Sequence, residues 1–210
     1  MSPSRNRSSN LLFRPLRLTR VSAPAVEPVT LTEAKKHLGL LDDSDDGYVT
    51  DLLAVARENM ESDTRRVFIS QQWDLFLEWF PAAEAAIELP TPPLISVDSI
   101  TYVDEAGTTQ TMPVADYEVD TATEPGRVRP VPNVDWPTTQ LDRMIAVTVR
   151  FTAGYGAAAS DVPAGIKHAM KLFIGHYFEN RELTSPTRIT RIPEAVDCLV
   201  ARYRWGDYPL

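Results

Sequence analysis

The sequence predicts an α+β fold in which a small antiparallel β module is inserted into a core of four helices. Apolar residues recur about every 3.6 residues near both ends of the chain, as on one face of a helix, but alternate with polar residues in the middle, as in half-buried strands. The 210 residues suffice for one medium-sized domain or for a compact domain with an insertion. We expect an extended N-terminal arm at residues 1–29, a helical core at residues 30–66 and 157–206, an inserted β module at residues 67–153 and a C-terminal tail at residues 207–210.

The first two helices have clear start signals. Thr30-Leu31-Thr32-Glu33 is a capping box, in which the Thr hydroxyl accepts from a free backbone N–H and the Glu side chain reaches back. Gly39 can take the left-handed conformation that ends this helix. A second helix is expected from about Asp46 to Arg66. Its apolar stripe comprises Val49, Leu52, Leu53, Ala56 and Met60.

The β module begins where the period changes to two. Trp73, Leu75, Leu77 and Trp79 alternate with Asp74, Phe76 and Glu78. Further short strands are expected at residues 87–89, 99–104, 108–113, 117–120, 127–129 and 145–152. Glu105-Ala106-Gly107 is typical of a hairpin turn between residues 99–104 and 108–113. The many prolines of this region suit edges and loops rather than central strands.

The last two helices start near prolines. Pro163 is expected at the first helical position, with Asp161 as its N-cap. The strongest apolar stripe of the chain follows and comprises Ile166, Ala169, Met170, Phe173, Ile174, Tyr177 and Phe178. The final helix is expected to start at Pro193 and to end at Gly206, with an apolar stripe of Val196, Leu199, Val200 and Tyr203. Cys198 lies beside this stripe and is predicted to be a buried structural thiol.

Charge and composition exclude several classes of protein. The net charge is −8, but residues 1–20 contain five arginines and no acid, so they carry +5 and the remainder carries −13. An acidic body is a poor candidate for wrapping nucleic acid, because phosphate contacts need clustered Lys and Arg. A single cysteine excludes an intrachain disulfide framework and a cysteine-based zinc site. No apolar run is long enough for a transmembrane helix or a secretory signal, and a mitochondrial transit peptide is a minor alternative for residues 1–20.

The motif search predicts no catalytic, metal or cofactor site. Residues 42–47 imitate the start of a calcium loop, but Leu53 occupies the position where a bidentate Glu is required. Residues 154–159 match the spacing of a dinucleotide-binding loop, but no helix opens within them and no parallel βαβ unit surrounds them. His168 and His176 are eight residues apart, about 80° around a helix, so they do not form an i, i+4 ligand pair.

Both ends of the chain are candidates for docking to a partner. In the N-terminal arm, arginines are interleaved with leucines and a phenylalanine, which fits either a solvated, disordered arm or a docking arm that becomes ordered on a partner surface or near DNA. We expect part of this arm to lie extended against its own domain or a neighbour. The aromatic C-terminal residues fit either an interface or packing against their own helices. The candidate docking residues are Arg5, Arg7, Phe13, Arg14, Arg17, Arg20, Tyr203, Arg204, Trp205, Tyr208 and Leu210.

Several segments, in their order and spacing, resemble the head–tail connector proteins of tailed bacteriophages, also called head–tail adaptor or head-completion proteins. The resemblance covers about residues 26–206 and leaves out the first twenty residues. Its segments are Pro28 to Leu38, Asp45 to Met60 with Thr64-Arg65-Arg66, Gln71 to Leu75, Ile87 to Pro90 with Pro93-Leu94 and Val97, Val149 to Gly156 with Val162-Pro163, Ile166 to Glu182, and Ile192 to Ala195 through Tyr203-Arg204.

The resemblance implies a structural role. Such proteins form rings of about twelve copies beneath the portal at the capsid vertex. They extend the DNA channel and present the surface on which a stopper protein or the tail docks. The implied partners are therefore further copies of the chain, a portal protein and a stopper or tail-completion protein, with DNA passing through without sequence-specific binding. The implied location is the neck of a virion assembled in the host cytoplasm, with no membrane and no cofactor.

Three alternatives from other classes stay open. One is another neck protein, such as a stopper or tail-completion protein, although the four expected helices favour an adaptor. A DNA-binding packaging factor is another, against which the acidic body argues. An enzyme with a small β-rich pocket would need a convergent polar cluster, and no motif supports one.

Overall fold

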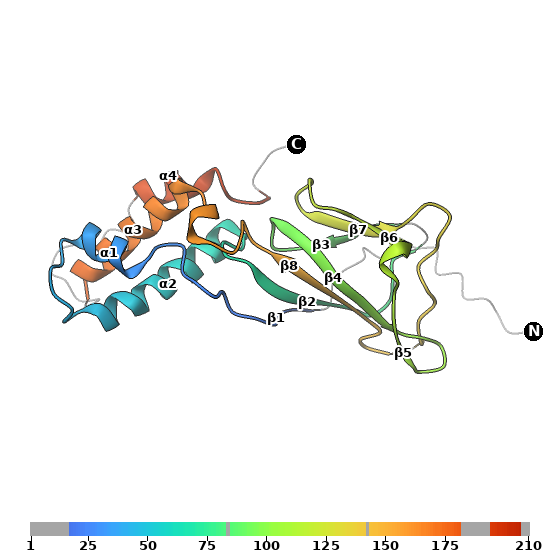
Figure 1. The fold of residues 1–210 in the computed structure, drawn as a ribbon. Coiled ribbons are helices and arrows are strands. Elements are labelled where there is room, and N and C mark those ends of the chain that lie inside the picture. Colours follow the sequence, from blue (N-terminus) through green and yellow to red (C-terminus); the bar gives the residue numbers. More distant parts are fainter. Residues whose placement is uncertain (1–16, 83–84, 142, 182–193, 207–210) are drawn as a thin grey trace, which may run out of the picture.

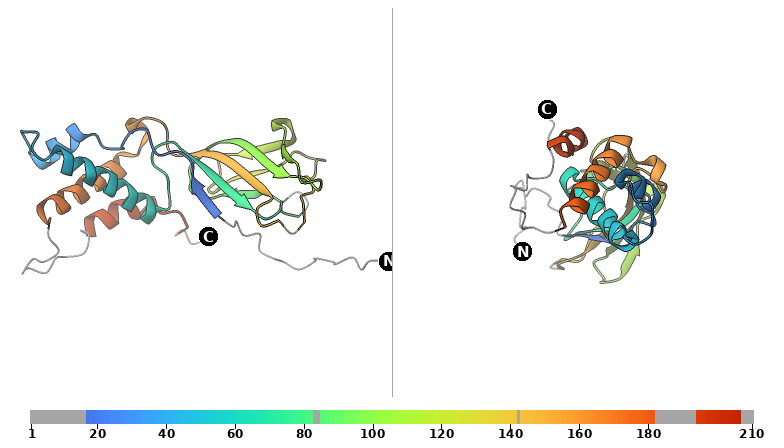
Figure 2. Two further views of the ribbon diagram at one scale, coloured as in Figure 1. Left: turned by 90° about the horizontal axis from the view of Figure 1, so that it is seen from below. Right: turned by 90° about the vertical axis from the view of Figure 1, so that its left-hand side faces the viewer.

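The computed structural model describes residues 17–82, 85–141, 143–181 and 194–206. In these residues, four α-helices lie at one end of an elongated molecule and two antiparallel sheets lie at the other (Figure 1). Two further views show the same separation along the long axis, with the helices side by side when the molecule is seen from their end (Figure 2). The α+β fold predicted from the sequence is therefore confirmed.

The N-terminal helices form as their sequence signals predict. Helix α1 (Leu31–Leu38) starts with the capping box: the N–H of Glu33 donates to Thr30 Oγ1 at 3.2 Å, and the N–H of Thr30 donates to Glu33 Oε2 at 2.9 Å. Gly39, with a φ of 72°, ends the helix. Helix α2 (Asp46–Thr64) buries the whole expected stripe, and it stops two residues before Arg66 because Arg65 takes a left-handed conformation with a φ of 55°.

Helix α3 (Ala164–Glu179) packs between the other helices through its expected apolar stripe. Ile166, Ala169, Met170, Phe173 and Ile174 are all buried. The predicted N-cap role of Asp161 is wrong. Asp161 lies in the short 3-10 helix η2 (Ala159–Asp161), its carboxylate accepts from the N–H of Ala158 at 2.9 Å, and Pro163 occupies the N-cap position.

Helix α4 (Glu194–Ala201) is shorter than predicted. It ends at Ala201 instead of Gly206, and the chain continues in turns toward the end of α2. Val196 and Val200 face the core, but Cys198 is exposed, so the predicted burial of this thiol is wrong. Cys198 is two residues away from each valine, which corresponds to about 200° around a helix, so Cys198 lies on the face opposite the two buried valines.

The larger sheet has the strand order β1-β2-β8-β4-β5. Its strands are β1 (Arg17–Arg20), β2 (Gln71–Leu77), β4 (Leu94–Val103), β5 (Thr109–Thr111) and β8 (Val147–Ala153). Strand β8 is central, because Val149 lies opposite both Leu75 of β2 and Ile100 of β4. The β4–β5 hairpin confirms the predicted turn at residues 105–107, with Gly107 at a φ of 82°.

The smaller sheet, ordered β3-β7-β6, covers the inner face of the larger one. Its strands are β3 (Ile87–Leu89), β6 (Tyr117–Asp120), which follows the 3-10 helix η1 (Val114–Asp116), and β7 (Gly126–Pro130). Ile87, Leu89 and Val128 pack from the smaller sheet against the buried side chains of β2, β4 and β8. The two layers thus enclose one apolar core, as in a β-sandwich.

Several strands differ from their predicted boundaries, among them β4 and β2. Strand β4 begins at Leu94, whereas the sequence predicted a start at residue 99. The pattern missed the first half of the strand because register shifts between Leu94 and Ser96 and between Val97 and Ser99 break the alternation of apolar and polar residues. Strand β2 spans residues 71–77 rather than 73–79, so Trp79 lies beyond it and is exposed. The outer face of the larger sheet is polar, where Arg150 binds the Asp74 carboxylate with two hydrogen bonds of 2.8 Å.

The centre of the larger sheet is expected to carry much of the stability of the β module. Phe151 of β8 is fully buried, so Phe151→Ala should lower the free energy of unfolding by about 3–5 kcal/mol through lost burial and the resulting cavity. Equilibrium unfolding in urea measures this change. Thr111→Ala, on exposed β5, is the matched control and should change stability by less than about 0.5 kcal/mol. Equal effects of the two substitutions would contradict the assigned core.

Candidate docking surfaces

The described part of the N-terminal arm is an edge strand of the larger sheet. Strand β1 pairs antiparallel with β2, with Arg17 opposite Phe76 and Arg20 opposite Trp73. Arg17 and Arg20 are exposed, whereas Leu18 packs against the sandwich core. The expectation that part of the arm lies extended against its own domain therefore holds for β1. Arg5, Arg7, Phe13 and Arg14 lie outside the described residues.

A cluster around Arg57 joins the arm to the helices and to the sheet. The guanidinium of Arg57, which is almost fully buried, contacts Glu27 at 2.9 Å and Glu61 at 3.1 Å. Glu61 also accepts from the N–H of Phe68 at 2.8 Å and from the Gln71 side chain at 3.2 Å. Burial raises the pKa of Glu61, although these donors favour its charged form. Sequence reasoning missed this cluster, because no motif links its members.

A second cluster, around Arg66, holds the described end of the chain. Arg66 donates through Nε to the carbonyl oxygen of Tyr203 at 2.5 Å and through Nη1 to Glu124 of the β6–β7 loop at 2.6 Å. The N–H of Trp205 donates to the carbonyl oxygen of Thr64 at 2.9 Å. The end of α2, the tip of the β6–β7 hairpin and the C-terminal segment thus meet at one side chain.

The aromatic end of the chain therefore packs, as far as it is described, on its own helices. Arg204 binds the Asp63 carboxylate with contacts of 2.8 Å, and the guanidinium of Arg202 lies 5.0 Å from the ring centroid of Tyr203. Tyr203 and Trp205 are both half-buried. Tyr208 and Leu210, the other candidate docking residues of this end, lie outside the described residues.

The exposed face of α2 carries acids. Asp51 and Glu58 are exposed and seven residues apart, so they lie on one face, with exposed Val55 between them. The acidic segment before α2 has a local role, because Lys35 of α1 contacts Asp43 at 2.5 Å and Asp46 at 2.6 Å.

An open groove of about 520 Å³ lies on the β module. Its aromatic floor is formed by Phe80 and Trp136, whose rings stack with centroids 4.7 Å apart, and Tyr102 meets Phe80 edge-on at 5.7 Å. The indole N–H of Trp136 donates to the carbonyl oxygen of Ala85 at 2.9 Å, which fixes that ring. The sequence predicted no groove here, because its residues come from three separate loops.

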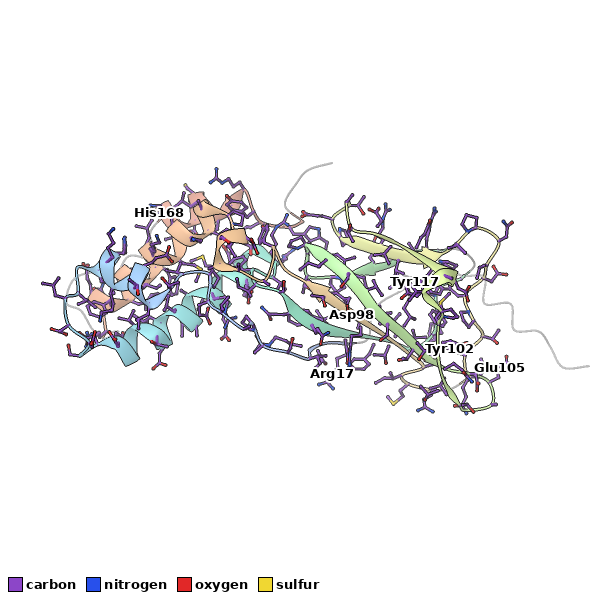
Figure 3. The ribbon with its side chains drawn as sticks, viewed as in Figure 1. Arg17, Asp98, Tyr102, Glu105, Tyr117 and His168 are labelled. Carbon is purple, nitrogen blue, oxygen red and sulfur yellow. The ribbon has the colours of Figure 1, made fainter. Side chains whose placement is uncertain are left out.

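The rim of this groove is acidic and apolar. It includes the exposed carboxylates of Glu105 and Asp135 and the side chain of Leu141, which is 82% exposed. Hydrogen bonds from Gln110 and the N–H of Thr108 lower the pKa of neighbouring Asp104, which keeps that carboxylate charged. Met144, 84% exposed, and Ile145 follow Leu141 in the same loop. Figure 3 shows Glu105 at the end of the molecule away from the helices, whereas His168 lies on the helices.

The described residues contain no group of three or more His, Cys, Asp or Glu side chains that could hold a metal ion. None of the helices in the described ranges is long and apolar enough to cross a membrane.

Residues 28–120 match the family model of the phage gp6-like head-tail connector proteins. This match confirms, over those residues, the family resemblance predicted from the sequence. No curated protein sequence matches the chain.

Solved structures of gene transfer agent (GTA) particles contain chains with the same fold. A chain from the neck of an empty GTA particle, computed with C6 symmetry, has a TM-score of 0.73 and 24% identity, covering 92% of this chain and 100% of its own. A chain from the virion of the native GTA particle has a TM-score of 0.73 and 24% identity, covering 89% and 94%. A chain from the neck of the native particle, computed with C12 symmetry, has a TM-score of 0.67 and 24% identity, covering 92% and 100%.

The Arg66 cluster is expected to control the order of the C-terminal segment. Arg66→Ala removes the donor to Tyr203 and the ion pair with Glu124, so it should cost about 1–3 kcal/mol of stability. It should also speed hydrogen exchange at the amide of Trp205. Mass spectrometry of exchange measures the second effect. Arg129→Ala, which removes the more exposed ion pair with Glu118, is the control and should leave exchange at residues 203–206 unchanged.

Proposed function

We propose that this chain is a head–tail adaptor, a structural protein in the neck of a tailed phage or phage-like virion. In this role it forms a ring beneath the portal, extends the DNA channel and provides the docking surface for a stopper protein or the tail. One observation carries the proposal: the fold is shared with a GTA neck chain over 92% of this chain and 100% of the other, at a TM-score of 0.73. The connector-family match of residues 28–120 supports it independently. The role requires no catalysis and no cofactor, and the virion would be assembled in the host cytoplasm.

A ring of about twelve copies fits the symmetry of the related necks. One was computed with C12 symmetry and another with C6, and both are compatible with twelve subunits. A ring needs a heterologous interface, in which two different patches of each subunit meet. The helical end and the β module supply different surfaces on one elongated chain, which supports this arrangement.

The acidic face of α2 suits a DNA channel. Asp51 and Glu58 are exposed on this face, and like charge discourages the duplex from adhering to the wall. We assign these two acids to the channel lining.

The net negative charge of the chain argues against a DNA-binding packaging factor. Another neck protein, a stopper or tail-completion protein, is the second candidate, because the related chains come from necks as a whole. The four helices favour the adaptor.

The two ends of the chain are assigned to the portal. Residues 1–10 contain Arg5 and Arg7, and residues 207–210 contain Tyr208 and Leu210. Arg17 and Arg20 belong to β1, and Arg204 and Trp205 contact α2, so these four already have a place within the fold. These four residues would contribute to docking as parts of the folded surface.

Electron microscopy of the chain mixed with its portal, or of the native particle, tests the ring. The expected image is a ring of about twelve subunits collinear with the portal, with Asp51 and Glu58 facing the lumen. A ring with these acids on its outer rim would contradict the channel assignment alone. Absence of a ring from both samples would contradict the adaptor role, and a salt-sensitive DNA-binding assay would then test the packaging alternative.

Two short deletions test the portal contacts. Deleting residues 1–10, and separately residues 207–210, should weaken binding to the portal in at least one case, since these segments carry Arg5 and Arg7, and Tyr208 and Leu210, among the candidate docking side chains. Binding to immobilised portal measures the effect. Glu118→Gln, on the smaller sheet, is the control and should bind normally. Unchanged binding by both deletions would refute the assignment.

A further inference from the structure

The outer side of helices α1 and α3 gathers positive charge on a chain whose net charge is −8. Four cations and two of the three histidines of the sequence lie there, on α1, on α3 and on the turn that follows α4. We call this surface the basic face. Its residues are Lys36, His37, Lys167, His168, Lys171 and Arg202.

Contacts between α1 and α3 bring these side chains together. Lys167 Nζ lies 3.8 Å from a carboxylate oxygen of Glu33 on α1. A hydrogen bond from the backbone of its own capping box lowers the pKa of Glu33, and the charges of Lys167 and Lys171 lower it further, so both lysines lie close to that carboxylate. His37 lies against α3, because its Nε2 would be 3.6 Å from a Cβ at Gly175.

Much of this charge is not neutralised within the described part of the chain. There, no Asp or Glu forms an ion pair with Lys36, Lys171 or Arg202. Arg202 extends the basic face over the start of α3, since its Nη2 would be only 2.5 Å from a Cβ at Gly165. The basic face therefore has positive charge available for a partner that carries carboxylates or phosphates.

The packing of α2 on α3 turns the basic face away from the proposed channel. The two helices bury their apolar stripes in one core, so their exposed faces point away from each other. Asp51 and Glu58, on the exposed face of α2, are assigned to the channel lining. In that ring the basic face lies on the side of the helices away from the DNA, which favours carboxylates over phosphates as its partner.

A second copy of the chain offers few free carboxylates to this face. Because α2 of every copy lines the proposed channel, the helical ends of the copies are neighbours around it. Exposed acids of the sandwich such as Glu105 lie at the other end of the molecule (Figure 3). At the helical end, aspartates of the segment leading into α2 already pair with Lys35 and Arg181 of their own chain. The acidic partner is therefore another protein of the neck.

The segments assigned to the portal leave the fold away from the basic face. Arg17, where the described arm begins, lies on the sandwich, whereas His168 lies on the helices (Figure 3). The C-terminal segment is held at the junction between the two ends by Arg66. The helical end is thus left for the protein on the other side of the ring, which is the stopper.

We propose that the basic face of α1 and α3 binds an acidic segment of the stopper protein, with Lys36 and Lys171 contacting its carboxylates. This inference rests on the proposed adaptor role and names the site and the chemistry of one of its contacts. The neighbouring cations of the basic face attract the same segment and speed its encounter with the ring.

Carbodiimide cross-linking of the assembled portal, ring and stopper tests the contact, because the reagent joins an amine to a carboxylate that touches it. Mass spectrometry is expected to find Lys36 or Lys171 linked to an Asp or Glu of the stopper. The pair of Lys167 and Glu33, 3.8 Å apart in one chain, is the internal control and should be linked with or without the stopper. A ring assembled from isotope-labelled and unlabelled chains distinguishes links within a copy from links between copies.

A charge reversal tests the same contact by affinity. Lys36→Glu with Lys171→Glu should weaken binding of the stopper to the portal-bound ring about tenfold, as expected for losing two exposed ion pairs. Added salt should reduce this difference. The matched control, Arg127→Glu with Arg143→Glu on the sandwich, changes the net charge equally and should bind the stopper normally. Electron microscopy of each variant reports whether its ring is intact.

The outcomes separate this inference from the proposed function. A stopper-bound ring without these cross-links, or with unchanged affinity after the charge reversal, overturns the inference and leaves the adaptor role intact. Links from Lys36 or Lys171 to another copy, or loss of the ring in the reversed variant, overturn it in favour of a contact between copies. DNA retained by the native ring but not by the variant overturns it in favour of DNA. Absence of the native ring overturns both proposals.

Discussion

Two arginines, the buried Arg57 and the half-buried Arg66, fix the helices to the β-sandwich, and the relative placement of the two ends depends on that junction. Arg57 connects Glu27 of the N-terminal segment with Glu61 of α2, and Glu61 holds the start of the sheet through the N–H of Phe68. Arg66 connects the same end of α2 to the β6–β7 loop and the C-terminal segment. Removing one partner of such a pair leaves a buried charge without compensation, so the clusters restrict how far the two ends of the molecule can move relative to each other.

Local signals in the sequence predicted the elements that depend on local physics. The capping box of α1, the stripes of α2 and α3 and the β4–β5 turn each follow from contacts between residues a few positions apart. Two of the boundary errors have tertiary causes. The bulges of β4 hide its first half from a period-of-two pattern, and α4 ends early because Tyr203 and Trp205 bind the end of α2.

The candidate surfaces were partly visible in the sequence. The charge contrast between the arm and the body follows from counting residues in the sequence. The groove could not be found in this way, because Phe80, Glu105 and Trp136 are brought together only by strand pairing. Their types were ordinary for strands and loops. Only the stacking of two distant aromatic rings makes them one surface.

The sheet edges constrain how copies of this chain can associate. Exposed edge strands invite pairing with other chains, and natural proteins limit this with short strands and charge. Both edges follow this rule: β1 has four residues and begins and ends with arginine, and β5 has three exposed polar residues. Extended strand-to-strand pairing between subunits is therefore disfavoured. In the proposed ring, contacts between copies would therefore depend on side chains rather than on backbone pairing. The first twenty residues carry +5 and the remainder carries −13, and contacts between two identical faces would bring like charges together. In the proposed ring, this charge pattern would therefore favour head-to-tail closure over a two-fold dimer.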